Sequence, residues 1–202
     1  MRYHHGDLRR ALLDALPQVI AVAGLERLSL RALARQAGVS HGAPAHHFTD
    51  KRGLLTAFAV EGSEHLERLV SDALSRPAAA DHVARLSAVG LGYLEFALQY
   101  PAHFRITLRP ELLNMLDPEL LRARASAGQL LDLVLKDAEE AGFLTARDHP
   151  NVRMAAWSLA HGYASIAADA MTGTPADALR RQARRTFDHY ARAVLRENLA
   201  AE

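Results

Sequence analysis

The chain contains no cysteine among its 202 residues. This absence excludes disulfide cross-links, thiolate metal ligands and thiol nucleophiles together, and it fits the reducing conditions of a cytoplasm. The sequence also has no apolar run long enough to cross a bilayer, and its beginning lacks the apolar core of a signal peptide. We therefore expect a cytoplasmic protein with no membrane partner.

A strong net charge is also absent, since 24 Lys and Arg side chains oppose 23 Asp and Glu side chains. The distribution is nevertheless uneven. Residues 1–53 hold eight basic and four acidic side chains, whereas the rest of the chain holds 16 and 19. A basic segment in an otherwise balanced chain indicates a polyanionic partner at that end. Half of the residues are hydrophobic, which argues against disorder and is enough for a folded core.

The sequence shows no strand-like alternation, no glycine-rich phosphate loop and no Gly-x-Ser-x-Gly nucleophile elbow. Helical apolar spacing instead recurs between proline and glycine breaks, which is typical of an all-α protein. About nine helices are expected, over residues 8–23, 30–37, 40–48, 51–74, 81–99, 102–108, 117–141, 150–171 and 174–199.

Two short helices joined by a sharp turn are predicted within residues 29–48. Ser29 can cap the first helix, Gly38 supplies the backbone freedom of the turn, and Ser40 can cap the second helix. The outward side of the second helix would carry small or hydrogen-bonding side chains and no carboxylate, so it can approach a polyanion. These residues are His41, Gly42, Ala43, Ala45, His46 and His47.

This stretch resembles the helix-turn-helix of the TetR (tetracycline-repressor) family of bacterial transcription regulators. The resemblance rests on LSLRALARQAGVS at 28–40, HHFTDKRGLL at 46–55 and RYHHGDLRRALL at 2–13. It implies a helix-turn-helix DNA-binding domain over 1–50 and a helical regulatory and dimerisation domain over 51–202. It further implies a homodimeric repressor that binds a near-palindromic double-stranded DNA operator and responds to a small-molecule effector, which the sequence leaves unidentified.

The resemblance also assigns roles to individual residues of the N-terminal domain. His41 and His46 are the predicted base-edge contacts, while Gly42 and Ala43 would allow close approach and a methyl contact with thymine. Phosphate contacts are predicted for other side chains nearby. The full predicted DNA-binding set is Ser29, Arg31, Ser40, His41, Gly42, Ala43, His46, His47 and Lys51. Ala45 stands where the family usually has a tyrosine.

Lys51 and Arg52 place two cations at the start of a long predicted helix, where the helix dipole disfavours positive charge. A bound DNA phosphate would resolve that conflict. The alternative is that solvent screens two exposed cations at little cost.

The C-terminal part carries a second resemblance, because Trp157, His161 and Gly162 match the WHG-type regulatory domain of the same family. An effector pocket is predicted from aromatic and histidine side chains, although ordinary core packing explains them equally well. Its residues are Phe96, Tyr100, His103, Phe104, Trp157 and His161. The last two helices are expected to form the dimer through Leu159, Tyr163, Ile166, Phe187, Tyr190 and Val194, unless these residues are core of one chain.

Other functions remain as alternatives at this point. The 11 histidines suggest a metal site, but adjacent helix residues point about 100° apart, so His41, His46 and His47 cannot form one compact site without further ligands. A helical enzyme would use a histidine such as His103 or His161. A small-molecule binding module of the same fold without DNA affinity is the closest alternative. We predict no catalytic residue, cofactor or metal.

Overall fold

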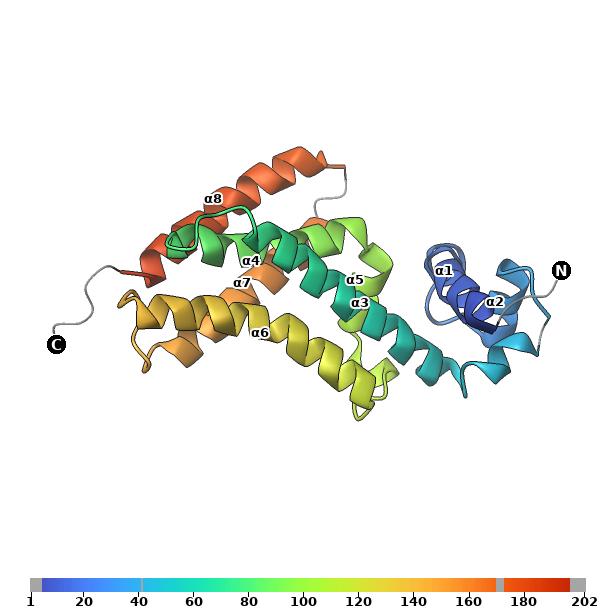
Figure 1. The fold of residues 1–202 in the computed structure, drawn as a ribbon. Coiled ribbons are helices and arrows are strands. Elements are labelled where there is room, and N and C mark those ends of the chain that lie inside the picture. The colour runs from blue at the N-terminus through green and yellow to red at the C-terminus, as the bar shows by residue number, and fades with distance from the viewer. Residues whose placement is uncertain (1–4, 41, 170–172, 197–202) are drawn as a thin grey trace. The chain divides into compact units, whose positions relative to one another are not determined.

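The computed structural model describes residues 5–40, 42–169 and 173–196 (Figure 1). In these ranges it contains α-helices, two short 3-10 helices and no strand, which confirms the all-α class with a helix count close to the predicted one. The α-helices are α1 (His5–Ala23), α2 (Leu30–Gln36), α3 (Lys51–Leu74), α4 (His82–Gln99), α5 (Pro101–Thr107), α6 (Pro118–Glu140), α7 (His149–Asp169) and α8 (Ala176–Val194). The 3-10 helices are η1 (Ala43–His46) and η2 (Pro110–Leu112).

Side-chain caps begin several of these helices where the sequence predicts them. The Ser29 hydroxyl accepts a hydrogen bond from the Ala32 backbone N–H at 3.1 Å. The Asp81 carboxylate accepts one from the Ala84 N–H at 2.9 Å. Each cap satisfies a backbone donor that the first turn of a helix leaves without a partner. Local sequence therefore fixes where α2 and α4 begin.

The chain divides into two compact units. Unit 1 contains residues 1–62 and 102–121, and unit 2 contains residues 63–101 and 122–202. The core of unit 1 joins apolar residues of α1, α2 and α3 to residues of α5 and the segment that follows it. These units are defined by which residues pack together. The boundary predicted at residue 50 instead separates a DNA-binding domain from a regulatory domain, and it stays a prediction.

In unit 2, α4 packs along both α7 and α8 (Figure 1). Two glycines of α4 permit close packing. A Cβ on Gly90 would lie 2.9 Å from the Phe187 ring of α8, and a Cβ on Gly92 would lie 2.6 Å from the Val70 Cα of α3. Because real Cβ atoms do not come that close, only glycine lets these elements approach so far. The two glycines thus let α4 pack closely against the Phe187 ring of α8 and against the backbone of α3.

Candidate nucleic-acid interface

The turn after α2 has the geometry of a tight helix end. Gly38 adopts a φ of 68°, the left-handed conformation that glycine enters without a Cβ penalty. The Val39 N–H donates to the Ala34 carbonyl at 3.0 Å, so a carbonyl of the last turn is satisfied. Leu33 and Ala34 are fully buried beneath this turn. The turn therefore places the segment that follows α2 on a fixed path.

The segment after the turn differs from the predicted second helix. It forms the four-residue 3-10 helix η1, with Gly42 at its N-cap and no side-chain cap. The expected Ser40 cap is therefore wrong, although the Ser40 carbonyl accepts a bond from the Ala43 N–H at 3.0 Å. Glycine and proline weaken an α-helix in so short a segment, and Pro44 removes one backbone donor.

Exposure separates the predicted DNA contacts into groups. Ser29, Arg31, Ser40, Gly42 and His46 are exposed. Two further members are partly buried, namely His47 and Lys51. His41 lies outside the described residues.

Ala43 does not fit its predicted role, because only 8% of its surface is exposed and its methyl packs inside unit 1. Ala45 is the exposed small residue of the segment. The reason is the short 3-10 helix, whose turn angle differs from that of the α-helix assumed from the sequence. The burial of Ala43 therefore argues against the predicted contact between its methyl group and a thymine.

Lys51 has a structural contact that the sequence did not indicate. Its Nζ donates to the Leu25 carbonyl at 2.8 Å, which ties the start of α3 to the loop between α1 and α2. Asp50 caps the same helix, since its carboxylate accepts from the Gly53 N–H at 2.7 Å. A carboxylate at a helix N-terminus offsets part of the dipole conflict created by the two cations. Lys51 keeps further N–H donors for a phosphate.

Arg9 is a surface cation that the sequence analysis missed as a candidate. Its guanidinium carbon lies 5.7 Å from the centre of the Phe48 ring, at cation-π distance. Phe48 is buried two residues after the end of η1, so it positions the exposed Arg9 beside the segment predicted to read bases. The sequence signal for Arg9 was its place in the basic segment of residues 1–53.

The predicted effector residues are divided between the units. His103 and Phe104 belong to unit 1, and the other four belong to unit 2. Phe96 and Phe104 are both buried. The rings of Phe96 and Tyr100 lie 6.5 Å apart. Core packing accounts for the buried phenylalanines, as the sequence analysis allowed.

Trp157 and His161 form an aromatic pair on α7. Their ring centres lie 5.1 Å apart at an interplanar angle of 27°, and Trp157 remains 48% exposed. The His161 Nδ1 is hydrogen-bonded to the Tyr93 hydroxyl at 2.9 Å. Burial lowers the pKa of His161 and raises the pKa of Tyr93 to about 12, the latter against the charge of Arg124. Both hydrogen-bonded groups are therefore neutral near pH 7.

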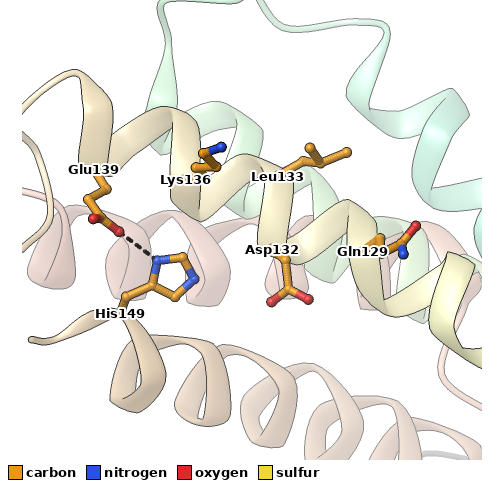
Figure 2. A pocket seen from close by; sticks show the side chains of 6 residues that line it. All are labelled: Gln129, Asp132, Leu133, Lys136, Glu139 and His149. Atoms are coloured by element: carbon orange, nitrogen blue, oxygen red, sulfur yellow. Dashed lines mark hydrogen bonds and ion pairs between the residues drawn. The ribbon is translucent and has the colours of Figure 1, made fainter. Parts of the chain in front are cut away.

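A groove of about 400 Å³ lies between α6 and the start of α7 (Figure 2). Its residues are Gln129, Asp132, Leu133, Lys136, Glu139 and His149. None of them belongs to the predicted effector pocket. Its charges already have partners, because the His149 Nδ1 lies 2.9 Å from a Glu139 oxygen and Arg153 pairs with Asp132. This groove gives no support to an effector site of the predicted composition.

The predicted dimer residues are mostly engaged within one chain. Phe187 is buried against α4. The Tyr163 hydroxyl donates to the Leu179 carbonyl at 3.2 Å, and the Tyr190 hydroxyl donates to the Val152 carbonyl at 3.0 Å. Leu159 packs against the hydrophobic cluster that contains Phe187, and Val194 packs against the one that contains Val152. Of the predicted set only Ile166 is exposed, at 58%. For Phe187 the alternative is therefore correct, because its side chain belongs to the core of a single chain.

No helix in the described part of the chain is long and apolar enough to span a bilayer. Among the same residues, no three histidine or carboxylate side chains converge as metal ligands would. The described residues therefore offer no metal site to set beside the candidate DNA-binding surface around η1.

Two family models match most of the chain. The model described as "Bacterial regulatory proteins, tetR family" matches residues 12–58, and "Tetracyclin repressor-like, C-terminal domain" matches residues 86–194. The chain is 31% identical to the HTH-type transcriptional regulator BetI of Cronobacter sakazakii over 78% of its own length and 74% of that protein. It is 31% identical to BetI of Yersinia pestis over 56% of its length and 58% of that regulator.

Solved structures show the same fold. A protein of unknown function from Rhodococcus sp. RHA1 superimposes with a TM-score of 0.78 and 31% identity, covering 97% of this chain and 100% of that one. A bacterial regulatory protein in the tetR family from Rhodococcus RHA1 gives a TM-score of 0.71 at 20% identity, covering 95% and 98%. At that lower identity the likeness concerns the fold alone.

Proposed function

Because this chain belongs to the TetR family of bacterial DNA-binding transcriptional regulators, we propose that it is a cytoplasmic repressor with no catalytic activity. It would bind a near-palindromic operator as a homodimer and change its affinity when a small molecule binds. The observation that carries the proposal is the turn fixed by Gly38, which is followed by an exposed, carboxylate-free segment with cations around it.

The reading surface is proposed to consist of η1 and the residues before it. His46 is exposed and can donate or accept a hydrogen bond at a base edge, and Gly42 permits close approach of the backbone. His41 keeps its proposed base contact. Arg31 and Lys51 would hold phosphates and set the register of the protein on the duplex.

Further phosphate contacts are proposed for the exposed Ser29, Ser40 and Arg9, and for the partly buried His47. These side chains surround η1 in the sequence or, for Arg9, stack on the ring that follows it. Contacts of this kind carry no sequence information, and they make affinity fall as salt rises.

The dimer is proposed to form through the outward face of α7. Ala155, Ser158, Gly162 and Ile166 recur at three- and four-residue spacing, which places them on one side of the helix. A Cβ on Gly162 would meet nothing within 4 Å, so no contact within the chain requires a glycine there. Glycine inside a helix costs about 1 kcal/mol relative to alanine. Close approach of α7 from a second copy would account for it.

Effector contacts are proposed for Trp157 and His161. The half-exposed indole offers a flat apolar surface, and its histidine neighbour is held by Tyr93. Aromatic surfaces beside a few fixed polar groups are typical of small-molecule sites. The effector remains unidentified.

A mobility-shift titration on the DNA flanking the chain's own gene tests the proposal. We expect a specific complex whose affinity falls steeply as salt rises, because phosphate contacts release counterions. The His46→Ala variant should lose specificity while keeping salt-dependent, non-specific binding. Absence of a complex with any genomic fragment at low salt would instead support a binding module of this fold that lacks DNA affinity.

A further inference from the structure

The outward face of α8 is rich in arginine. This helix packs along α4 in unit 2 and buries its apolar side there (Figure 1). Between residues 181 and 196 the chain holds five arginines and a single carboxylate, which belongs to the partly buried Asp188. All five arginines are exposed, and together they form the arginine stripe of Arg181, Arg184, Arg185, Arg192 and Arg196.

Helical spacing places three members of the arginine stripe in one row. Arg185 follows Arg181 by four residues, and Arg192 follows Arg185 by seven residues, so the three side chains leave the helix on the same side. At 1.5 Å per residue the row is about 16 Å long. Like charges four residues apart destabilise a helix. The pair formed by Arg181 and Arg185 therefore does not serve the stability of α8.

The arginine stripe is not used in contacts within the chain. None of its five guanidinium groups forms an ion pair or a side-chain hydrogen bond with another residue that the structure describes. The neighbouring Arg180 shows the contrast. Its Nη2 donates to the Glu95 carboxylate of α4 at 3.0 Å, and its Nη1 donates to Asp177 at 3.0 Å. The arginine that holds α8 to α4 is thus paired, whereas the arginine stripe faces solvent.

The single sign of these charges distinguishes α8 from other solvated helix faces of the chain. A solvated face usually mixes both signs. On α6 of the same unit, Lys136 Nζ lies 3.6 Å from a Glu140 oxygen, and the Asp132 and Asp137 carboxylates pair with arginines. The formal net charge of the whole chain is only +1. A concentrated positive row on a nearly neutral protein attracts a polyanion to that row.

We propose that the arginine stripe is a second nucleic-acid contact, which binds the phosphate backbone of duplex DNA without reading its sequence. A guanidinium group forms paired hydrogen bonds with phosphate oxygens. The phosphates of one strand recur every 3.4 Å along the duplex axis, so a row of about 16 Å passes several of them. The contact lies in unit 2 and does not require the reading segment around η1, which lies in unit 1.

The composition of the face favours DNA over a protein or a membrane. Residues 176–196, all of which the structure describes, include no exposed large apolar side chain. Protein interfaces are organised around a buried apolar or aromatic core, which this face cannot supply. The apolar side of α8 is itself buried, with Leu179 and Phe187 each 3% exposed, so the helix has nothing to insert into a bilayer. Charge alone is sufficient for sequence-independent binding to DNA.

Anisotropy titrations of the full-length protein with a labelled duplex of random sequence, at salt concentrations from about 50 to 300 mM, test this contact. In Arg185→Gln/Arg192→Gln, each lost phosphate contact should lower the slope of log K against log salt by about 0.9. The slope should therefore become shallower by about 1.8 for each protomer engaged, and the affinity near 0.1 M salt should fall at least about tenfold. Glutamine keeps nearly the helix propensity of arginine, so α8 should still fold.

Arg122→Gln/Arg147→Gln is the matched control. Both residues are exposed in unit 2 outside α8, so this variant removes the same charge from another part of the surface. Its salt slope should stay close to that of the wild type. If the α8 double variant does not fold, Arg185→Gln alone should still lower the slope by about 0.9. Equal loss of slope in the two double variants would reduce the effect to total charge and overturn the proposal.

A polyglutamate peptide in place of the duplex separates an acidic protein partner from DNA. If Arg185→Gln/Arg192→Gln weakens binding of polyglutamate but not of the duplex, the partner is an acidic protein segment and the DNA contact is wrong. Selective operator binding by the wild type, together with an unchanged random-duplex slope in this variant, overturns the contact and leaves the proposed function intact. A slope that depends on the arginine stripe without any operator preference supports the contact and overturns the repressor.

Discussion

Replacing Gly162 by alanine should stabilise the single chain and weaken its dimer. A Cβ at this position meets nothing within 4 Å, so the substitution adds no clash inside the chain. Alanine is favoured over glycine in a helix interior by about 1 kcal/mol. If a second α7 packs against Gly162, however, the new methyl group separates the two helices, and overpacking of this kind costs about 1–3 kcal/mol at the interface.

Gly92→Ala is the matched comparison, because it adds the same methyl to another helix-interior glycine. Here the Cβ would lie 2.6 Å from the Val70 Cα and 3.0 Å from the Leu69 carbonyl oxygen, which are backbone atoms that cannot turn away. We expect Gly92→Ala to lower the free energy of unfolding by about 1–3 kcal/mol, since the clash exceeds the gain in helix propensity.

Sedimentation over a range of protein concentrations, together with denaturant unfolding at low and high concentration, provides the measurement. Unfolding of an oligomer depends on protomer concentration, so the two effects can be resolved. Gly162→Ala should raise the dimer dissociation constant at least about fivefold while leaving unfolding at low concentration unchanged or improved. A Gly162→Ala dimer as tight as the wild-type dimer would refute the α7 interface.

Three further substitutions test the core packing, one helix cap and one ion pair. Phe187→Ala should lower the free energy of unfolding by about 3–5 kcal/mol in denaturant titrations, because it empties the site against Gly90; a loss below 1 kcal/mol would contradict the buried placement. Ser29→Ala should cost about 1 kcal/mol through loss of the α2 cap and should weaken operator binding, whereas an unchanged melting temperature would exclude the cap. The hydrogen bond from Arg180 lowers the pKa of Glu95, so this carboxylate contributes stability above its unfolded pKa that is lost as pH falls through the lower folded value. Glu95→Gln should accordingly be less stable than wild type at neutral pH and equal to it at low pH, and a pH-independent difference would contradict this.

Local features of the fold could be predicted from the sequence. Ser29 and Asp81 cap the helices expected of them, because a cap depends only on residues two or three positions away. Gly38 takes its left-handed conformation for the same local reason. The all-α class followed from periodicity and breakers, which are also local. These parts of the prediction needed no knowledge of tertiary packing.

The direction in which side chains face was harder to predict. Ala43 was expected outside on an α-helix, but the 3-10 geometry of η1 turns it inward. Phe187 was expected at a partner, yet Gly90 on α4 opens a site for its ring within the chain. An amphipathic pattern indicates that a stripe is buried, and it does not say which neighbour buries it. That information lies in contacts between residues far apart in sequence.

The contacts of Glu61 show the same limit, since one of its carboxylate oxygens accepts a hydrogen bond from Arg10 at 2.6 Å and the other lies 3.6 Å from His103 Nε2. The sequence singled out His103 as a pocket candidate and as a histidine that a helical enzyme could use, and nothing in its spacing from Arg10 indicated that both lie beside one carboxylate. The three residues meet because α5 packs with the N-terminal helices in unit 1. Long-range pairing of this kind becomes visible only in the folded chain.

Selection of bound sequences from a pool of random DNA duplexes tests the central claim most directly. The purified wild-type protein should enrich one motif with two-fold symmetry, in which matching half-sites lie on one side of the duplex. His46→Ala should relax the preference at a symmetry-related pair of positions, because one base-edge contact is worth about 1–3 kcal/mol. Recovery of no enriched motif, or of one without symmetry that His46→Ala leaves unchanged, would contradict a dimeric regulator reading DNA through η1.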